Sequence, residues 1–377
     1  MLIDARHLRD GQPCTILGLG HTVLPEKYRY DCGRFIQEAL SEAGRAELRL
    51  DLDPEGRLTA AELLATATRK FLDTTGISSR YIFPDSVAAL AALAGEDCLL
   101  DAGAQASELD AILVGTNTSD SYTVATDLKK KLGAPVPAFV CDMQVACPVG
   151  AVVVQLGWHL VRSRQFRRVL VVGAEKASLL ASADAYKSAN LFGDAAFAML
   201  LGPGEREQFV FFDGGSDPYD GKDEFIRKTP SGFQQNGRAV HEYVARAIPE
   251  ELDRVFTKLG VGIGTLDHFF PHQPSSKTLD FLLRKMRQRW PEFRATVHRN
   301  VEDMGNTSGA CTGWMLSRAR REGQLRPGQL CLVASFGSGL SQSSYGFVVP
   351  DGFAKESPGP LPRAPGDETA GPSPRIV

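Results

Sequence analysis

Apolar positions follow two different periods along the first part of the chain. Short apolar runs typical of buried strands occur at 14–20, 110–115, 169–173 and 195–202. Apolar positions with helical spacing occur at 84–105, 123–133, 148–163 and, with a break near 53–56, over 27–72. Residues 75–81 are predicted to form a loop. Strands that alternate with helices in this way favour an α/β fold.

The same order of elements returns in the second part of the chain. Strand patterns occur at 266–271, 329–335 and 344–349, and helical patterns occur at 275–289 and 308–322. The repetition concerns architecture and not residue identity. It predicts two similar halves, 1–203 and 204–350, packed face to face. The helix starts near Cys147 and Asn306 are then expected to meet close to a pseudo-twofold axis.

Two segments fall outside the repeated pattern. Residues 203–240 connect the halves and are rich in Gly, Asp and Lys, which predicts an excursion over the surface. Residues 351–377 are rich in Pro, Gly and Ser. They offer almost no apolar anchor, and we therefore expect this tail to be disordered.

Composition and charge are those of an ordinary globular protein. The 377 residues can bury a large core, and 43% of them are hydrophobic and 23% charged. A net charge of −3 gives no overall attraction to nucleic acid or to an anionic membrane. The seven cysteines lack CxxC spacing, which speaks against a zinc knuckle or a disulfide framework and favours the reducing cytoplasm. We find no signal-peptide pattern and no apolar run of transmembrane length.

Cys147 lies where a short apolar run ends and a helical pattern begins. Pro148 fits the first helical position, where a missing N–H costs nothing. Cys147 is therefore predicted at a helix N-terminus. There, unpaired N–H groups and the helix dipole would lower the pKa of its thiol and favour a nucleophilic thiolate. For a cysteine taken alone, a buried structural role is the alternative.

Three further loops carry side chains that a cysteine nucleophile needs. His272 follows a predicted strand, Asn306 precedes a predicted helix, and Ser338 lies between Gly337 and Gly339 after another strand. Each has a plain alternative when it is taken alone: a loop histidine, a helix N-cap and a hairpin turn. Their matching positions in a duplicated framework favour a common site.

The four loops together resemble the β-ketoacyl-acyl-carrier-protein synthase III family of the thiolase superfamily. The matching segments follow the family's order over roughly residues 14–350; they are 75–80, 145–147, 191–194, 236–240, 271–273, 305–308 and 336–339. The resemblance implies the thiolase-like layered αβαβα fold built from two duplicated halves. It also implies a homodimer.

The resemblance implies a role for each site residue. Cys147 would take an acyl group from a thioester, and His272 and Asn306 would bind the thioester carbonyl of a malonyl-type extender. The backbone N–H groups of Cys147 and Ser338 would form the oxyanion hole. Phe192-Gly-Asp194 would support the site without taking part. Neither a metal nor another cofactor is implied, since the thioesters are carried on coenzyme A or acyl carrier protein.

Two departures from the family pattern concern the substrate. The family commonly has a tryptophan a few residues before the segment at 75–80, stacked on the adenine of coenzyme A, and here residues 68–72 contain none. This favours an acyl carrier protein as donor. A bulky aromatic residue is frequent at the acyl-pocket gate, which Ser121 and Tyr122 match. Ungapped counting places Ser121 at the gate itself, which would leave room for a longer or branched acyl chain.

A basic cluster follows His272 on the predicted helix at 275–289, with Lys277, Arg284 and Lys285 among its members. One interpretation is a solvated helix face. The other is a docking surface for an acidic carrier protein, because Lys277 occupies a position that is usually basic in the family. No aromatic residues interleave with these charges, which argues against nucleic acid as a partner.

The predicted function is therefore a decarboxylative Claisen condensation, with Cys147 as acyl carrier, in fatty-acid-like, polyketide or other secondary-metabolite biosynthesis. A first alternative is an acyltransferase on the same fold that forms an ester or amide without loss of CO₂. Relatives of that kind often alter the asparagine that Asn306 retains. A second alternative is a non-catalytic partner subunit, although such subunits tend to lose the cysteine or the histidine.

Overall fold

The computed structural model describes residues 3–5, 10–217, 226–229 and 232–353. Two sheets form its framework. The first has five strands in the order β2 (Cys14–His21), β8 (Asp194–Pro203), β7 (Val169–Lys176), β5 (Ala111–Gly115) and β6 (Phe139–Met143). The second has six strands in the order β1 (Ile3–Asp4), β9 (Phe209–Ser216), β15 (Ser341–Val348), β14 (Leu330–Gly337), β12 (His268–Pro271) and β13 (Thr296–Val297).

Both sheets repeat one topology. In the first sheet β5 pairs parallel with β6 and β7, while β8 is antiparallel to β7 and β2. In the second sheet β12 pairs parallel with β13 and β14, while β15 is antiparallel to β14 and β9. The strand order β8-β7-β5-β6 thus matches β15-β14-β12-β13, with β9 as the counterpart of β2. This is the duplication that the hydrophobic pattern predicts.

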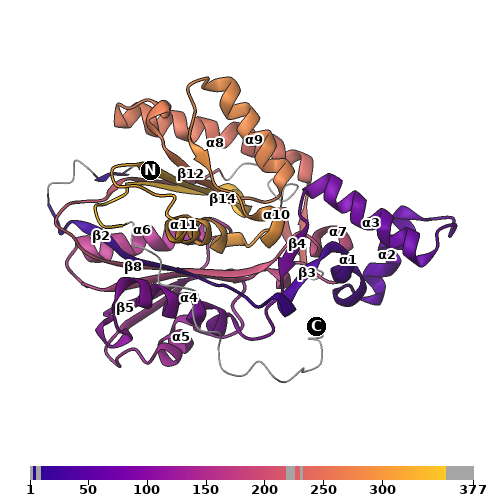
Figure 1. Ribbon diagram of the computed structural model, residues 1–377, viewed down its shortest axis with the longest axis horizontal. Coiled ribbons are helices and arrows are strands. Elements are labelled where there is room, and N and C mark those ends of the chain that lie inside the picture. Colours follow the sequence, from indigo (N-terminus) through magenta and orange to yellow (C-terminus); the bar gives the residue numbers. More distant parts are fainter. Residues whose placement is uncertain (1–2, 6–9, 218–225, 230–231, 354–377) are drawn as a thin grey trace.

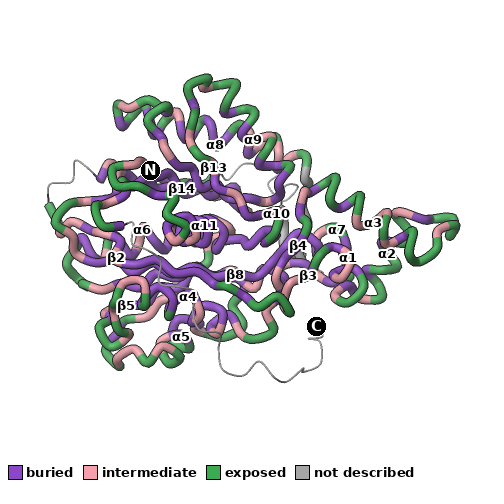
Figure 2. Tube along the Cα trace, viewed as in Figure 1, coloured by how far each residue is buried: buried purple, intermediate pink, exposed green. Residues whose placement is uncertain are grey.

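Helices form three layers around the two sheets (Figure 1). The outer face of the first sheet is covered by α4 (Val87–Ala102) and α5 (Val124–Leu132), and that of the second by α8 (Gly237–Leu259) and α9 (Ser276–Arg289). Between the sheets lie α6 (Val149–Arg162) and α11 (Cys311–Arg321). The arrangement is therefore the predicted layered αβαβα fold, and Figure 2 shows its strands buried between exposed outer helices.

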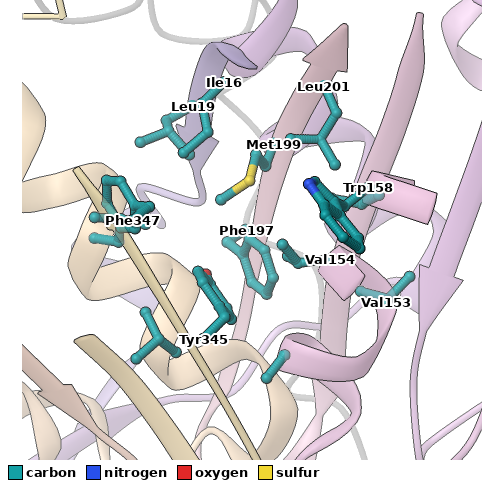
Figure 3. Packing of buried hydrophobic residues seen from close by; sticks show 14 of the residues in the cluster. Ile16, Leu19, Val153, Val154, Trp158, Phe197, Met199, Leu201, Tyr345 and Phe347 are labelled. Carbon is teal, nitrogen blue, oxygen red and sulfur yellow. The ribbon is translucent and has the colours of Figure 1, made fainter. Parts of the chain in front are cut away.

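The central layer holds the largest side chains of the core. Trp158 of α6 packs with Phe197 of β8 between the sheets, and Tyr345 and Phe347 of β15 approach from the other side (Figure 3). Burial of each of these rings removes some 150–250 Å² of surface from water and stabilises the fold accordingly. α6 and the start of α11 also approach closely, because a Cβ on Gly150 would lie 2.1 Å from the carbonyl oxygen of Gly309.

Smaller elements extend the molecule beside the two sheets (Figure 1). They are β3 (Arg29–Asp31), α1 (Cys32–Arg34), α2 (Glu42–Leu52), α3 (Ala60–Thr75), β4 (Ser79–Tyr81), α7 (Tyr186–Ala189) and α10 (Val301–Met304). A hairpin of β10 (Ile226–Thr229) and β11 (Gly232–Gln235) lies between the halves in the sequence. No helix in the described part of the chain combines the length and the apolar character needed to span a bilayer.

Four predictions on the elements were wrong in part. The loop predicted at 75–81 contains β4, which pairs with β3. The excursion predicted at 203–240 contains β9, a strand of the second sheet, because its apolar residues are needed opposite β15. The helix predicted from 308 begins at Cys311, after a 3₁₀ turn. Phe353 is buried against Phe347 and belongs to the folded part, whereas the rest of the predicted disordered tail lies outside the described residues.

Candidate active site

Cys147 lies in the sharp turn that joins β6 to α6. Pro148 is the N-cap of α6, which begins at Val149, one residue later than predicted. Ala146 has a φ of +52°, which is rare for a residue other than glycine and marks local strain. Its carbonyl oxygen accepts hydrogen bonds from the N–H of Val149 at 3.0 Å and from Nδ2 of Asn117 at 3.0 Å. These contacts hold the nucleophile turn in place.

The end of β14 packs directly against this turn. A Cβ on Gly337 would lie 2.8 Å from the backbone nitrogen of Cys147 and 2.8 Å from Cδ of Pro148, so only glycine leaves enough space. Ser335 Oγ donates a hydrogen bond to the carbonyl oxygen of Cys147 at 3.1 Å. Ser338 follows Gly337 and opens a short 3₁₀ turn. The structure thus brings the predicted oxyanion residues of the two halves side by side.

Asn306 reaches the same place from the second half. Its backbone pairs with Phe192, since the N–H of Asn306 donates to Leu191 at 2.8 Å and its carbonyl accepts from Gly193 at 3.2 Å. Its Oδ1 accepts a hydrogen bond from the N–H of Ser308 at 2.9 Å, which leaves Nδ2 as the donor end of the side chain. Ser308 has a φ of +48°, and its Oγ lies 3.7 Å from Cys147 Sγ.

His272 directly follows β12 and is buried. Its N–H donates to Ala334 at 2.8 Å, and its ring meets the edge of Phe336 at 5.1 Å between centroids. Nδ1 lies 3.1 Å from Sγ of Cys311. Burial lowers the pKa of His272 to about 3, so the imidazole is neutral. Burial raises the pKa of Cys311 to about 12, so its thiol keeps its proton.

The contact with the protonated thiol of Cys311 favours one tautomer of the neutral His272 ring. A protonated thiol can donate to Nδ1, and a neutral imidazole that accepts at Nδ1 carries its hydrogen on Nε2. Charge on Cys147 also raises the pKa of Cys311. In this tautomer, Nε2 is the donor atom of the His272 ring.

The predicted lowering of the Cys147 pKa was wrong. Burial raises the pKa of this thiol to about 12, and the negative charge of Glu175 adds to the increase. The helix N-terminus is present as predicted, but removing a thiolate from water costs more than the dipole returns. A separate step must therefore take the proton from Cys147 when it reacts.

Glu175 was missed by the sequence analysis. It follows the apolar run of β7 as the next-to-last residue of that strand, and it is fully buried beside Ser308. A charged residue at the end of an otherwise apolar strand was the available signal, because sites in α/β sheets form at the carboxyl ends of strands. Burial raises the pKa of Glu175, while hydrogen bonds from Asn117, Thr118 and Ser308 lower it.

A cavity of about 830 Å³ opens beside the His272 loop. Its walls come from the end of α3, the start of α8 and the first half of α9; they include Thr75, Arg238, His241, Pro274, Lys277, Phe281 and Arg284. Two of the three predicted docking residues, Lys277 and Arg284, thus line this cavity, and Lys285 does not. Both Arg284 and Lys285 lie over the ring of Phe281, at 5.0 and 5.7 Å from its centroid, so the statement that no aromatic residue interleaves with these charges was wrong.

The remaining predicted residues lie elsewhere. Ser121 and Tyr122 are exposed on the loop before α5 and do not line the cavity, so their role as an acyl gate stays a prediction. Asp194 accepts hydrogen bonds from the N–H groups of Phe83 at 2.8 Å and Ser178 at 2.9 Å, which is a supporting contact. In the described part of the chain, no group of three metal-ligating side chains could hold a metal ion.

Two sequence profiles match the chain. The profile of 3-oxoacyl-[acyl-carrier-protein (ACP)] synthase III matches residues 141–218, and that of the C-terminal part of the same enzyme matches residues 256–347. The β-ketoacyl-[acyl-carrier-protein] synthase III of Bacillus pumilus is 31% identical over 296 residues, which cover 76% of this chain and 93% of that protein.

Solved structures of similar proteins agree with the fold. The β-ketoacyl-[acyl-carrier-protein] synthase III of Thermus thermophilus superposes with a TM-score of 0.69 and 27% identity, covering 88% of this chain and 98% of that one. A priming β-ketosynthase from a polyketide biosynthetic pathway gives a TM-score of 0.72 and 25% identity, covering 92% of this chain and 99% of that one.

Proposed function

Because the chain belongs to the 3-oxoacyl-[acyl-carrier-protein] synthase III family, we propose that it is an acyltransferase that condenses an acyl group with a malonyl-type thioester. The observation that carries this proposal is the meeting of the Cys147 turn, the Asn306 loop and the end of β14 at one buried place, with His272 linked to it through Cys311.

The first half-reaction loads the enzyme. The sulfur of Cys147 attacks the carbonyl carbon of an acyl thioester, the carrier leaves as a thiol, and the acyl group remains as a thioester on Cys147. The N–H groups of Cys147 and Ser338 stabilise the negative oxygen of the tetrahedral intermediate. The close contact of Gly337 with the Cys147 backbone nitrogen supports this pairing.

The second half-reaction forms the carbon–carbon bond. The extender loses CO₂, and the electron pair of the broken bond becomes an enolate whose oxygen accepts hydrogen bonds from His272 and Asn306. The neutral state of His272, with its hydrogen on Nε2, and the donor Nδ2 of Asn306 support these roles. The carbanion then attacks the acyl carbon on Cys147. The chemistry requires no metal and no redox cofactor.

The cavity beside His272 is the proposed entrance for the carrier arm. The positive side chains of Lys277, Arg284 and Arg238 line it. Pro274, two residues after His272 in the sequence, is also part of its wall. A phosphopantetheine arm is an extended chain with an anionic phosphate at its outer end, and cations at a pocket mouth suit that charge. Acyl carrier protein and coenzyme A both carry this arm. We assign Lys277 and Arg284 to its recognition.

Side chains of the α2–α3 region bear on whether acyl carrier protein or coenzyme A delivers the acyl group. Lys70, the cation nearest to the position of the missing tryptophan, forms an ion pair with Asp51 at 2.8 Å and does not line the cavity. Phe71, the one aromatic residue among 68–72, is buried, so an adenine ring has no exposed aromatic partner in this segment. This supports acyl carrier protein as the donor over coenzyme A.

Acylation of Cys147 is the first test. Intact-protein mass spectrometry after incubation with acyl thioesters should show one acyl adduct on the natural protein and none on Cys147→Ala. Cys141→Ala is a matched control, because Cys141 is a half-buried thiol on β6 only six residues away. An acyl adduct that persists on Cys147→Ala would overturn the proposal.

Release of CO₂ separates the condensation from simple acyl transfer. A malonyl thioester labelled in its free carboxyl group should release labelled CO₂ in step with product. Product that forms without labelled CO₂ would favour the acyltransferase that makes an ester or amide. The retained Asn306 donor ranks that alternative second.

We also propose that the protein is a homodimer that pairs through β6. This strand is the edge of the first sheet, and it carries Phe139 with 46% of its surface exposed. The neighbouring side chains Tyr122 and Val136 are almost fully exposed. An unpaired edge strand beside exposed apolar side chains is a template for a second chain. A partner at this edge would cover the loop that holds Ser121 and Tyr122.

A further inference from the structure

Glu175 is a buried carboxylate that the proposed mechanism does not use. It has no exposed surface, and its carboxyl oxygens accept several hydrogen bonds, including a long one from Thr116 Oγ1 at 3.4 Å. The other donors are the N–H of Asn117 at 2.9 Å and its Nδ2 at 2.5 Å, Thr118 Oγ1 at 3.0 Å, Ser308 Oγ at 3.1 Å and the N–H of Gly309 at 3.3 Å. Such a shell satisfies the ionised form of the carboxyl group.

The hydroxyl of Ser308 connects this carboxylate to the nucleophile. Its Oγ lies 3.1 Å from Glu175 Oε1 and 3.7 Å from Cys147 Sγ. A serine hydroxyl has one hydrogen to donate, and an ionised carboxylate can only accept. The hydrogen of Ser308 therefore points to Glu175. Its oxygen accepts from Asn117 Nδ2 at 3.4 Å, which leaves one lone pair to which the thiol of Cys147 can donate its own hydrogen.

His272 cannot serve as the proton acceptor in this arrangement. Its Nδ1 is occupied by the thiol of Cys311 at 3.1 Å, and its Nε2 already carries a hydrogen. The titratable groups around Cys147 are thus Glu175 on β7, His272 after β12 and Cys311 on α11. Of these three, Glu175 alone is held by a shell made only of donors.

We propose that Glu175, acting through Ser308, is the proton acceptor that converts Cys147 into a nucleophile. Ser308 touches the reacting sulfur, and Glu175 acts through it. The inference rests on the proposed function only in naming Cys147 as the nucleophile. It concerns how that sulfur loses its proton, whichever electrophile it meets.

The proton and the electrons balance along this path. The sulfur of Cys147 bonds to the acyl carbon while its proton passes to Ser308 Oγ, and the hydroxyl proton passes to Glu175. The carbonyl electron pair moves onto oxygen and, when it returns, the bond to the carrier sulfur breaks. Glu175 then gives its proton back through Ser308 to the departing sulfur, which leaves as a thiol.

An internal acceptor removes a penalty that the buried site would otherwise impose. With a pKa of about 12, Cys147 would exist as thiolate in about one molecule in 10⁵ at pH 7. Without the relay, the reaction rate would follow this small fraction and rise about tenfold with each pH unit. With the relay, the rate depends far less on pH, because the proton passes to an acceptor inside the site and not to hydroxide in solution.

The test measures Cys147 acylation against pH. Acetyl, butyryl and octanoyl thioesters of N-acetylcysteamine are offered between pH 7 and pH 9, and the adduct is followed by rapid quenching and intact mass. The natural protein should react at a nearly constant rate. Glu175→Gln and Ser308→Ala should be slowest at pH 7, gain about tenfold per pH unit and approach the natural rate at high pH.

Thr22→Val is the matched control, since the buried hydroxyl of Thr22 bonds to the backbone of Ala196 and has no hydrogen bond to Glu175 or Cys147. It should keep the flat profile. A thermal melt of each variant separates misfolding from chemistry, and Ser308→Gly, which suits the positive φ, replaces Ser308→Ala if that protein does not fold. Equal slowing at every pH would make both residues merely structural. If Glu175→Gln reacted faster than the natural protein at every pH, Glu175 would act only through its negative charge and not as a proton acceptor. Either result overturns the relay.

Iodoacetamide provides an arm that does not depend on the proposed function. It alkylates Cys147 without any thioester, and the same pH profiles are expected for the natural protein and the variants. If no thioester acylates the natural protein but the alkylation profiles behave as stated, the relay stands and the condensing function fails. If thioesters acylate every variant with a flat profile, the function stands and the relay fails.

Discussion

At the scale of single residues, Cys311 has a task that differs from that of Cys147. Its thiol stays protonated and holds Nδ1 of His272, which keeps the hydrogen of the imidazole on Nε2. Cys311→Ala removes this contact and lets both tautomers form. We expect decarboxylation of the malonyl thioester to fall about tenfold, because a misplaced donor no longer stabilises the enolate, while acylation of Cys147 stays unchanged. Labelled CO₂ release and intact mass measure the two steps separately.

Cys311→Ser is the control for this prediction. A serine hydroxyl is another donor of similar size and should restore most of the decarboxylation rate that Cys311→Ala loses. If the alanine and serine variants are equally slow, or if acylation falls together with decarboxylation, Cys311 does not act by fixing the tautomer of His272.

The identities of three site residues could be predicted from the sequence, but the environment around them could not. Cys147, His272 and Asn306 each stand at the end of a predicted element, and the duplicated pattern brings those ends together. The pKa of Cys147 could not be predicted, because the helix N-terminus is visible in the local sequence while burial depends on segments more than a hundred residues away. For the same reason Glu175 and Cys311 were missed.

At the scale of elements, the contact of β14 with the Cys147 turn allows a direct prediction. Gly337→Ala puts a methyl group 2.8 Å from the nitrogen of Cys147 and 3.2 Å from Cβ of Ala146, so the turn must move. We expect acylation to fall by about a hundredfold, since a shift of about 1 Å at a reacting centre has that cost. Overpacking should also lower the free energy of unfolding by about 1–3 kcal/mol.

Gly215→Ala is the matched control for that change. Gly215 lies on β9 of the same sheet, and a Cβ there meets no atom within 4 Å. This variant should keep the natural acylation rate and stability. An unchanged rate in Gly337→Ala would show that β14 does not position the nucleophile. Urea unfolding and the intact-mass assay give the two readouts.

The positions of helices and strands match the local hydrophobic pattern, except where a contact with a distant segment determines the structure. Residues 75–81 contain a strand only because β4 finds β3 as a partner, and neither is apolar enough to predict alone. Likewise α11 starts at Cys311 because Asn306 pairs with Phe192, which holds the preceding residues away from helical geometry. Such pairings are absent from any single window of sequence.

At the scale of the whole molecule, a buried ion pair connects α11 of the second half to α4 of the first half. Arg320 of α11 pairs with Asp101 of α4, and Asp101 also accepts a hydrogen bond from the N–H of Leu19 at 2.8 Å. Both charged side chains are largely buried. Arg320→Met keeps the aliphatic stem but leaves the carboxylate without its cation. We expect the free energy of unfolding to fall by about 3 kcal/mol, because an unpaired buried charge is costly.

Arg238→Ala is the comparison for this pair. Arg238 and Glu242 form an i,i+4 pair on the surface of α8, with 90% and 63% of their side chains exposed. Its loss should change the free energy of unfolding by at most about 0.5 kcal/mol. Equal effects of the two substitutions in urea unfolding would mean that burial does not govern the strength of the Arg320 pair.

The duplicated architecture was the part of the fold most open to prediction. The order of strand and helix patterns along the sequence indicates the duplication, and each half repeats this order with different residues. The strand β9 within 203–240 was not predicted, because its counterpart β2 precedes a long insertion in the first half. The insertion hides the correspondence in the sequence.

The exposed edge at β6 leads to a prediction on the assembly. Phe139→Lys places a charge on the edge strand, where it should repel a second copy and block strand pairing. The half-exposed position can hold a lysine without loss of the fold, so the natural protein should have the mass of two chains in light scattering and the variant the mass of one. Leu50→Lys is the control, since Leu50 is 73% exposed on α2 and belongs to another surface. If Phe139→Lys stays dimeric, or if Leu50→Lys alone dissociates, the interface lies elsewhere.

Because the loop with Tyr122 adjoins β6 through the contact of Asp142 with the start of α5, loss of the dimer should also change which acyl thioester loads fastest.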